Sequence, residues 1–316
     1  MRAGRQTTLR SSATLSGIGV HSGAPATVAL YPAEPNTGIV FVRTGADGCP
    51  QKELRADVRS VCATEFATVL GDRDGPVCAT AEHVLAALFG LGVDNAVIEI
   101  DGPEVPIMDG SAEEYVEAID RAGIVFTSAA RRYLKVLKPV AVTSGRSRGE
   151  LRPYSFGFRV ETEIEFAHPQ IGRQTIAFDL DPTTFRRDVA RARTFGFMSD
   201  VSKLWSAGYA LGACFENTVV LAEDRVLNPE GLRFGDEFVR HKALDAIGDL
   251  SLAGLPLLGA YRSICGGHKL NHAVISALIA DRSAWALVEA GDTQTARGQA
   301  DLPAAYPAPA FGPAVN

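Results

Sequence analysis

Cysteine is scarce in this sequence, and the few cysteines are widely spaced. Five occur in 316 residues, at positions 49, 62, 78, 214 and 265, and no two of them form a Cys-x-x-Cys pair. An odd number of scattered cysteines argues against a disulfide framework and against a zinc site built from thiolates. We therefore expect reduced thiols in a cytoplasmic protein, in which histidine and carboxylate side chains would hold any metal.

Long hydrophobic runs and an excess of positive charge are also absent. No apolar stretch reaches 18 residues, and the basic residues 1–5 are followed by threonine and serine instead of the apolar part of a signal peptide. We expect no stable insertion into a membrane. The net charge of −6 argues against nucleic acid as a partner, so an anionic substrate would need a local basic pocket. No obligate protein partner is evident.

The order of predicted elements indicates an internal duplication. A chain of 316 residues is long for one hydrophobic core, so two domains are expected. The first half has predicted strands at 13–20, 26–31, 39–43 and 96–100, one helix from about Thr80 that ends at Gly90 and Gly92, and another from Ser111. The second half has predicted strands at 133–142, 156–166 and 257–262, with helices from about Asp236 and His268. The spacing from His83 to Ser111 resembles that from His241 to His268.

These patterns predict an α+β fold made of two similar two-layer α/β sandwich domains, residues 1–127 and 133–290. Two such units facing each other would place His83 opposite His241 across a shared cleft, where the active site is expected. The second unit contains an apolar-rich insertion at about 198–221. Residues 291–316, rich in proline and alanine, are expected to be extended or disordered.

One segment, residues 240–249, carries a spacing typical of metal sites. His241, Asp245 and Asp249 stand at i, i+4 and i+8, so a helix would project all three from one face. A histidine followed by a carboxylate one turn later is half of a catalytic zinc site, which needs three protein ligands and an open position for water. The spacing alone also suits a solvated polar stripe on a surface helix.

Four stretches together resemble one known family. Residues 82–83, 106–112, 191–197 and 238–249 are similar to the zinc-dependent UDP-3-O-acyl-N-acetylglucosamine deacetylases of lipid A biosynthesis, and the resemblance runs from about Gln6 to about Trp285. It implies a pair of similar α+β domains with the active site between them. It also implies zinc-dependent hydrolysis of the N-acetyl group of UDP-3-O-(3-hydroxyacyl)-N-acetylglucosamine, an early committed step that gives the free 2-amino sugar nucleotide and acetate.

The resemblance also implies the catalytic groups. His83, His241 and Asp245 would hold one Zn²⁺ per chain, with water in the fourth position. The remaining catalytic roles would fall to Glu82 as general base, His268 as general acid, Asp249 as the group that orients His268, and Thr194 as an oxyanion donor. Taken alone, Glu82 could be an ordinary acidic residue of a first helical turn, His268 a loop residue, and Thr194 a cap or turn hydroxyl.

Substrate contacts follow from the same resemblance. Lys242 would meet the diphosphate, Phe195 the sugar and Phe166 the uridine. The 198–221 insertion, with Met198, Cys214 and Phe215, would form a passage for the acyl chain. Either phenylalanine could instead belong to the core, and the insertion alone would pass as an amphipathic core helix.

Two other functions remain open at the level of sequence. A zinc amidase of the same fold could act on another N-acetylated sugar or on a peptide. Lys242 together with the apolar insertion favours the acylated UDP-sugar over that alternative. A binding module without activity would be expected to have lost Glu82 or a zinc ligand, and none is lost.

Overall fold

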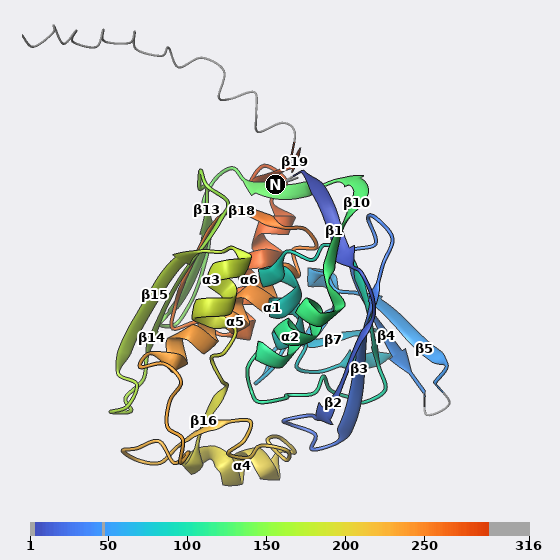
Figure 1. Cartoon of the computed structure of the whole chain (residues 1–316). Helices are drawn as coiled ribbons and strands as arrows, with labels where there is room; N and C mark the ends of the chain where they lie inside the picture. The colour runs from blue at the N-terminus through green and yellow to red at the C-terminus, as the bar shows by residue number, and fades with distance from the viewer. Residues whose placement is uncertain (1–3, 46–47, 291–316) are drawn as a thin grey trace, which may run out of the picture.

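The computed structural model describes residues 4–45 and 48–290, and they form an α+β fold. Figure 1 shows helices α1, α2, α5 and α6 between two sheets, one built by the first half of the chain and one by the second. Each half is thus a sheet covered by helices, and the helical layers of the two halves face each other. The prediction of paired two-layer units is confirmed.

The sheet of the first half has its last strand at the centre. Its order is β2-β3-β9-β4-β5, and β9 is antiparallel to β3 but parallel to β4. The strands are β2 (Ala13–Ile18), β3 (Pro25–Pro32), β4 (Ile39–Thr44), β5 (Pro50–Arg55) and β9 (Ala96–Ile100).

The second half repeats this arrangement strand for strand. A path β12-β13-β18-β14-β15 runs through its sheet, and β18 is antiparallel to β13 but parallel to β14. These strands are β12 (Val140–Ser144), β13 (Ser147–Arg152), β14 (Phe158–Glu165), β15 (Arg173–Asp179) and β18 (Leu257–Ile264). Both halves therefore share one topology, as an internal duplication predicts.

The central strand of each half lies between two helices in the sequence. Helix α1 (Glu82–Leu91) precedes β9 and α2 (Glu113–Ala122) follows it. Helix α5 (Glu237–Ser251) precedes β18 and α6 (His268–Ala280) follows it. Helix α1 packs along α5, so the equivalent helices of the two halves meet at the middle of the molecule. Their apolar faces join both sheets in one hydrophobic core.

Shorter elements surround this frame. Strand β1 (Arg5–Leu9) pairs with β10 (Ile124–Ala130), and β11 (Arg132–Val136) lies between β18 and β19 (Trp285–Glu289). The remaining strands are β6 (Val61–Ala63), β7 (Val69–Asp72), β8 (Gly75–Cys78), β16 (Phe195–Phe197) and β17 (Val219–Leu221). The remaining short helical segments are Val58–Ser60, α3 (Pro182–Thr184), Phe185–Val189, Met198–Asp200 and α4 (Val201–Ser206).

Two expected boundaries were wrong. The single strand expected at 133–142 is two strands, β11 and β12, because the chain leaves the extended ladder before Pro139, which has no N–H to donate. Gly90 does not end α1 but lies within it, and only Gly92 caps it, with φ of 77°. A Cβ on Gly90 would approach the ring of Phe185 to 2.4 Å, so this glycine permits close packing instead of a turn.

The insertion at 198–221 is not a core helix. Within it, α4 covers six residues, and the large side chains of Met198, Trp205, Leu211 and Phe215 are between 42% and 59% exposed. No helix of the described residues is both long and apolar enough to cross a lipid bilayer. The proline- and alanine-rich stretch 291–316 lies outside the described residues.

Candidate active site

Helix α1 begins with the first two site residues. Glu82 and His83 open the helix, and each is 3% exposed. Just before them, Thr80 has φ of 56°, a left-handed conformation that costs a β-branched residue free energy. The hydroxyl of Thr80 donates a hydrogen bond of 2.7 Å to the buried Glu104, which stabilises this turn. The chain thus enters α1 at a fixed angle, with both side chains buried.

Helix α5 supplies the next three site residues. His241, Asp245 and Asp249 are all 2% exposed or less, so the alternative of a solvated polar stripe is wrong. They face α1, and Gly248 lies at the closest approach of the two helices. A Cβ on Gly248 would come within 2.1 Å of the backbone carbonyl oxygen of Glu82. Only a residue without a side chain permits this contact.

His83, His241 and Asp245 form a group able to hold a metal ion. One ligand atom from each lies within 4.8 Å of the other two. Asp245 Oδ1 is 3.3 Å from His241 Nε2 and 3.8 Å from His83 Nε2, while Asp245 Oδ2 accepts a hydrogen bond of 2.9 Å from Lys242 Nζ. Lysine thus occupies one carboxylate oxygen, and the other faces both imidazoles.

The tautomer of His241 is set by the backbone. Its Nδ1 lies 3.0 Å from the carbonyl oxygen of Ala192, which can only accept, so Nδ1 carries the proton and Nε2 presents its lone pair. Metal-bound histidines commonly hold their second nitrogen in this way. His83 differs, because its buried Nδ1 has no hydrogen-bond partner among the described residues.

The ionisation of the three groups suits a cation. Burial, together with the nearby His241, lowers the pKa of His83 to about 3, and burial also lowers the pKa of His241. Burial alone would raise the pKa of Asp245, but His241 and Lys242 hold it well below its usual range. At neutral pH the group is therefore two neutral imidazoles and one carboxylate, the protonation states that metal binding requires. The residues fit a zinc ion.

A second polar cluster adjoins the first. His268, the first residue of α6, places Nδ1 2.9 Å from Asp249 Oδ2 and Nε2 3.8 Å from Glu82 Oε1. The second carboxylate oxygen of Glu82 accepts a hydrogen bond of 3.0 Å from the backbone N–H of Thr68. The Thr68 hydroxyl in turn donates to Asp249 Oδ1. Glu82, His268 and Asp249 are thereby joined in one buried network.

The pKa values of Glu82 and His268 are both raised, but for different reasons. Burial raises the pKa of Glu82 to about 7, although the charge of His268 opposes the shift. Burial lowers the pKa of His268, but the carboxylates of Asp249 and Glu82 outweigh it and raise the value to about 10. A carboxylate able to accept a proton near neutral pH thus stands next to a protonated imidazole.

Thr194 lies between Ala192 and Phe195, which both approach His241, on a segment held by backbone hydrogen bonds. Its N–H donates to the carbonyl of Gly110 at 2.7 Å, and its own carbonyl accepts from Val219 N–H at 2.8 Å. The preceding residue, Arg193, is 2% exposed and donates through Nε to the fully buried Glu237 at 2.9 Å. This ion pair fixes the segment against the start of α5.

Aromatic side chains border the centre next to His241, whose ring centroid is 6.4 Å from that of Phe195. Phe166 and Phe195 lie edge to face with ring centroids 5.8 Å apart, and Lys242 Nζ is 5.5 Å from the centroid of Phe195. Both phenylalanines pack partly against a small cluster of buried residues and keep part of their surface exposed. Their partial burial is therefore compatible with a role in the hydrophobic core and with a role in substrate binding.

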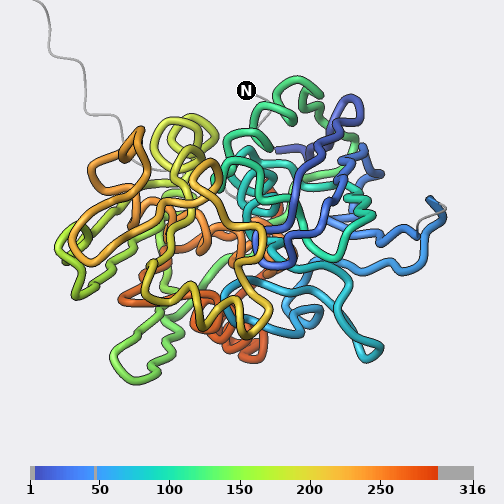
Figure 2. Tube along the Cα trace, turned by 90° about the horizontal axis from the view of Figure 1, so that it is seen from below, coloured from blue at the N-terminus to red at the C-terminus, as the bar shows by residue number. Residues whose placement is uncertain are grey.

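The 198–221 segment crosses to the first half of the chain. Figure 2 shows this yellow segment beside a blue loop of the first half. Leu211 N–H donates to the His21 carbonyl at 3.0 Å. Tyr209 packs edge to face on His21, with centroids 5.4 Å apart, and stands 4.9 Å from Phe66. Cys214 and Phe215, expected to line an acyl passage, are exposed. An apolar surface thus spans both halves of the chain.

Sequence reasoning missed three residues of this centre. Thr68 carries no sequence signal, because it reaches the cluster only through the fold. Asn271 donates to Asp249 Oδ2 at 2.8 Å, and its position three residues after His268 on α6 could have indicated it. Arg193 belongs to a motif that was recognised, but its role is visible only in the buried pairing with Glu237.

Comparison with known proteins agrees with this geometry. Residues 6–280 match the family described as UDP-3-O-acyl N-acetylglycosamine deacetylase. Proteins named UDP-3-O-acyl-N-acetylglucosamine deacetylase from Brucella ovis, Brucella canis and Brucella melitensis are each 50% identical over 287 residues. These alignments cover 90% of this chain and 99% of each relative. The chain therefore belongs to the UDP-3-O-acyl N-acetylglycosamine deacetylase family.

Proposed function

We propose that this protein is a zinc-dependent deacetylase of lipid A biosynthesis. It hydrolyses the N-acetyl group of UDP-3-O-(3-hydroxyacyl)-N-acetylglucosamine and releases acetate and the free 2-amino sugar nucleotide. The name of its relatives supports the substrate. The observation that carries the chemistry is a buried group of two imidazoles and a carboxylate directly beside Glu82 and His268.

His83, His241 and Asp245 would hold the zinc ion. When bound, zinc supplies Lewis acidity, which lowers the pKa of water and polarises a carbonyl group. The protein prepares these three side chains for a cation by burying them and by fixing the His241 tautomer through Ala192. Lys242 holds Asp245 Oδ2, which leaves Oδ1 for the cation.

Glu82 acts as the general base. The attacking water gives a proton to this carboxylate as its oxygen bonds to the acetyl carbon. A pKa raised to about 7 by burial makes Glu82 a much better proton acceptor than an exposed glutamate and leaves a large fraction ionised at neutral pH. The hydrogen bond from Thr68 N–H orients Oε2, so Oε1 is the oxygen turned toward His268.

His268 acts as the general acid. Its Nδ1 is anchored by Asp249, so Nε2 is the nitrogen that donates a proton to the sugar nitrogen as the carbon–nitrogen bond breaks. The water oxygen stays on the acetyl carbon as acetate, and the nitrogen leaves as an amine. Thr194, on the segment held by Arg193, stabilises the charge that develops on the acetyl oxygen.

The substrate would be held by three regions. Lys242, 24% exposed and next to the metal group, faces the diphosphate, and Phe195 and Phe166 contact the sugar and the uridine. Met198, Cys214 and Phe215 line the acyl passage in the 198–221 segment. Exposed apolar side chains in that segment support this assignment, because a soluble protein gains nothing from exposing them without a ligand.

The division of the chain and its compartment are part of the proposal. Residues 1–127 and 133–290 form the two domains, and the repeated strand order supports this division. The protein works in the cytoplasm, which agrees with the lack of a disulfide bond among its five cysteines.

Mass spectrometry tests this function directly. The purified protein is incubated with UDP-N-acetylglucosamine carrying or lacking a 3-O-hydroxyacyl chain, and loss of one acetyl group is followed. Rapid loss from the acylated compound alone is expected. No deacetylation of either compound, with metal bound, would reject the proposed activity.

A further inference from the structure

A cavity lies at the C-terminal ends of α1 and α5. It has a volume of about 470 Å³, within the range of ligand pockets, and none of the proposed catalytic or metal residues lines it. Helix α1 runs from Glu82 at the catalytic centre to Leu91 at this cavity, and α5 runs from Glu237 to Ser251, which also lines it. The cavity is therefore distinct from the active site and touches both of its helices.

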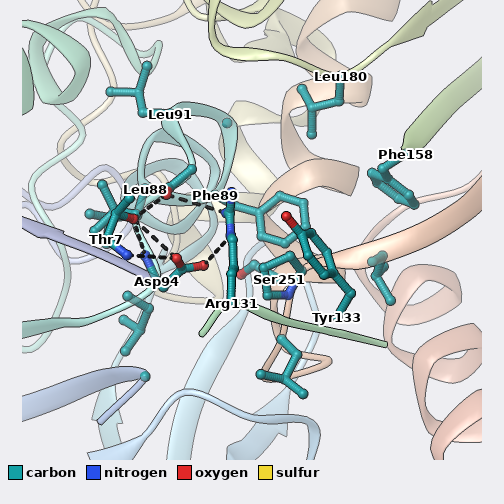
Figure 3. Close-up of a pocket in the computed structure, with 18 of the residues that line it drawn as sticks. Thr7, Leu88, Phe89, Leu91, Asp94, Arg131, Tyr133, Phe158, Leu180 and Ser251 are labelled. Atoms are coloured by element: carbon teal, nitrogen blue, oxygen red, sulfur yellow. Dashed lines mark hydrogen bonds and ion pairs between the residues drawn. The ribbon is translucent and has the colours of Figure 1, made fainter. Parts of the chain in front are cut away.

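The walls of this cavity are largely apolar and come from both halves of the chain. Leu85 and Leu88 of α1 form one side, and Phe158 and Leu180 of the second half form another. Figure 3 shows Leu88 and Leu91 across the cavity from Phe158 and Leu180. Leu255, in the turn before β18, lines it as well. An apolar chain placed here would contact side chains on several sides.

The polar groups at one edge of the cavity form hydrogen bonds and ion pairs with one another. Arg131 Nε lies 2.9 Å from Asp94 Oδ1, and Asp94 Oδ2 accepts a hydrogen bond of 2.9 Å from Thr7 N–H. The ring of Tyr133 lies against the same guanidinium, with its centroid 5.5 Å from the guanidinium carbon. Figure 3 shows this network at the cavity edge. These groups already have partners, so they do not call for a charged ligand.

Arg55, the other cation of the lining, is different. It is exposed at the end of β5, and among the described residues it makes no direct ion pair and no side-chain hydrogen bond, although its charge helps to lower the pKa of Asp57, two residues later. The remaining acid of the lining, Asp181, caps α3 by accepting from the N–H groups of Thr183 and Thr184. Arg55 also lines a small adjoining pocket, which Asp181 does not line. The cavity therefore has, beside its apolar interior, a positive charge that no carboxylate of the described residues holds in a direct ion pair.

We propose that this cavity binds a medium-chain fatty acid, with its carboxylate at Arg55 and its chain between Leu88 and Leu180. A carboxylate complements the exposed guanidinium, which has no direct ion pair among the described residues. The methylene groups of the chain are buried against the apolar side chains that line the cavity. The ligand would contact the C-terminal ends of α1 and α5, and because it binds only the folded protein it stabilises that state.

Binding of a chain-length series tests the site. The full-length protein is titrated calorimetrically with hexanoate, octanoate, decanoate and dodecanoate. Affinity is expected to rise about fourfold for each added methylene until the cavity is filled, and then to level off. Decanol and decyltrimethylammonium should bind more weakly than decanoate. No heat of binding with any carboxylate, or equal affinity for the ammonium compound, would overturn the proposal.

Variants locate the ligand. Leu180→Trp and, independently, Leu255→Trp should each weaken decanoate about tenfold by occupying the space of two methylene groups. Arg55→Gln should weaken it about threefold, the size expected for an exposed charge. Arg262→Gln, a matched exposed strand arginine outside the lining, should have no effect. Each variant is checked for an unchanged circular dichroism spectrum. Affinity lost in Phe215→Ala but kept in both tryptophan variants would place the ligand on the 198–221 surface and refute the site.

Discussion

His268 and Asp249 form a hydrogen-bonded pair between α6 and α5, with Nδ1 of the imidazole 2.9 Å from Oδ2 of the carboxylate. The pair is buried, and Thr68 and Asn271 occupy the carboxylate from two further sides. This contact orients the ring and opposes the effect of burial on its proton. It therefore bears on the pH range in which the proposed enzyme works.

The first prediction concerns that range. Burial lowers the pKa of His268, but Asp249 and Glu82 raise it to about 10, so His268 holds its proton through neutral pH and loses it on the basic side. Asp249→Asn removes a negative charge, so the pKa must fall and the basic limb of the kcat/KM profile must move to lower pH. An unchanged basic limb in this variant would assign that limb to another group. Asn271→Asp serves as the comparison, because it adds a negative charge instead of removing one.

The second prediction concerns the metal. His241→Ala should lose bound zinc and activity together, since three protein ligands become two. Metal analysis of the purified variant, beside turnover, provides the measurement. His272→Ala is the control, because His272 lies outside the metal group and bonds the carbonyl of Val58. Full zinc content with full turnover in His241→Ala would disprove the ligand assignment.

The third prediction separates catalysis from metal binding. Glu82→Gln keeps the shape of the side chain and the contact with Thr68 but cannot accept the proton. We expect zinc to be retained and kcat to fall on the order of 10²–10⁴-fold, the usual size of general acid–base catalysis. Near-normal turnover of the zinc-loaded variant would mean that a different group, such as His268 acting first as base, takes the proton.

The fourth prediction concerns the acyl chain. Each buried methylene is worth about 0.8 kcal/mol, so kcat/KM should fall by several orders of magnitude when the acyl chain is removed from the substrate. Phe215→Ala should reduce this preference for the acylated substrate. The zinc content should not change, because the variant leaves the metal and catalytic residues in place. Equal kcat/KM for both substrates would point to another N-acetylated substrate.

The fifth prediction concerns the approach of the two central helices. A Cβ on Gly248 would lie 2.1 Å from the carbonyl oxygen of Glu82, a rigid backbone atom. Gly248→Ala must therefore separate α1 from α5 and should cost about 1–3 kcal/mol of unfolding free energy, with loss of activity. Chemical denaturation measures the unfolding free energy, and a turnover assay measures the activity. Gly235→Ala, whose Cβ meets nothing within 4 Å, should leave both unchanged.

Much of the local structure could be predicted because it depends on periodicity. The α1, α2, α5 and α6 segments, the central strands β9 and β18, and the duplication all follow from residue spacing and from nearly equal distances in the two halves. The errors fell where tertiary packing overrides local preference. Gly90 stays helical because Phe185 needs its space, and the apolar segment at 198–221 forms a surface instead of a core helix.

The sequence by itself determined which side chains could do chemistry: His241, Asp245 and Asp249 share a helix face because a turn has 3.6 residues. Only the tertiary structure decided what those side chains meet. His83 and Glu82 join them from a helix more than 150 positions away, and Thr68 links Glu82 to Asp249 through contacts that no local pattern encodes. The cavity beside Arg55 likewise exists only where the two halves meet. Local spacing sets the face of an element, whereas burial, tautomer and pKa depend on neighbours that only folding brings together.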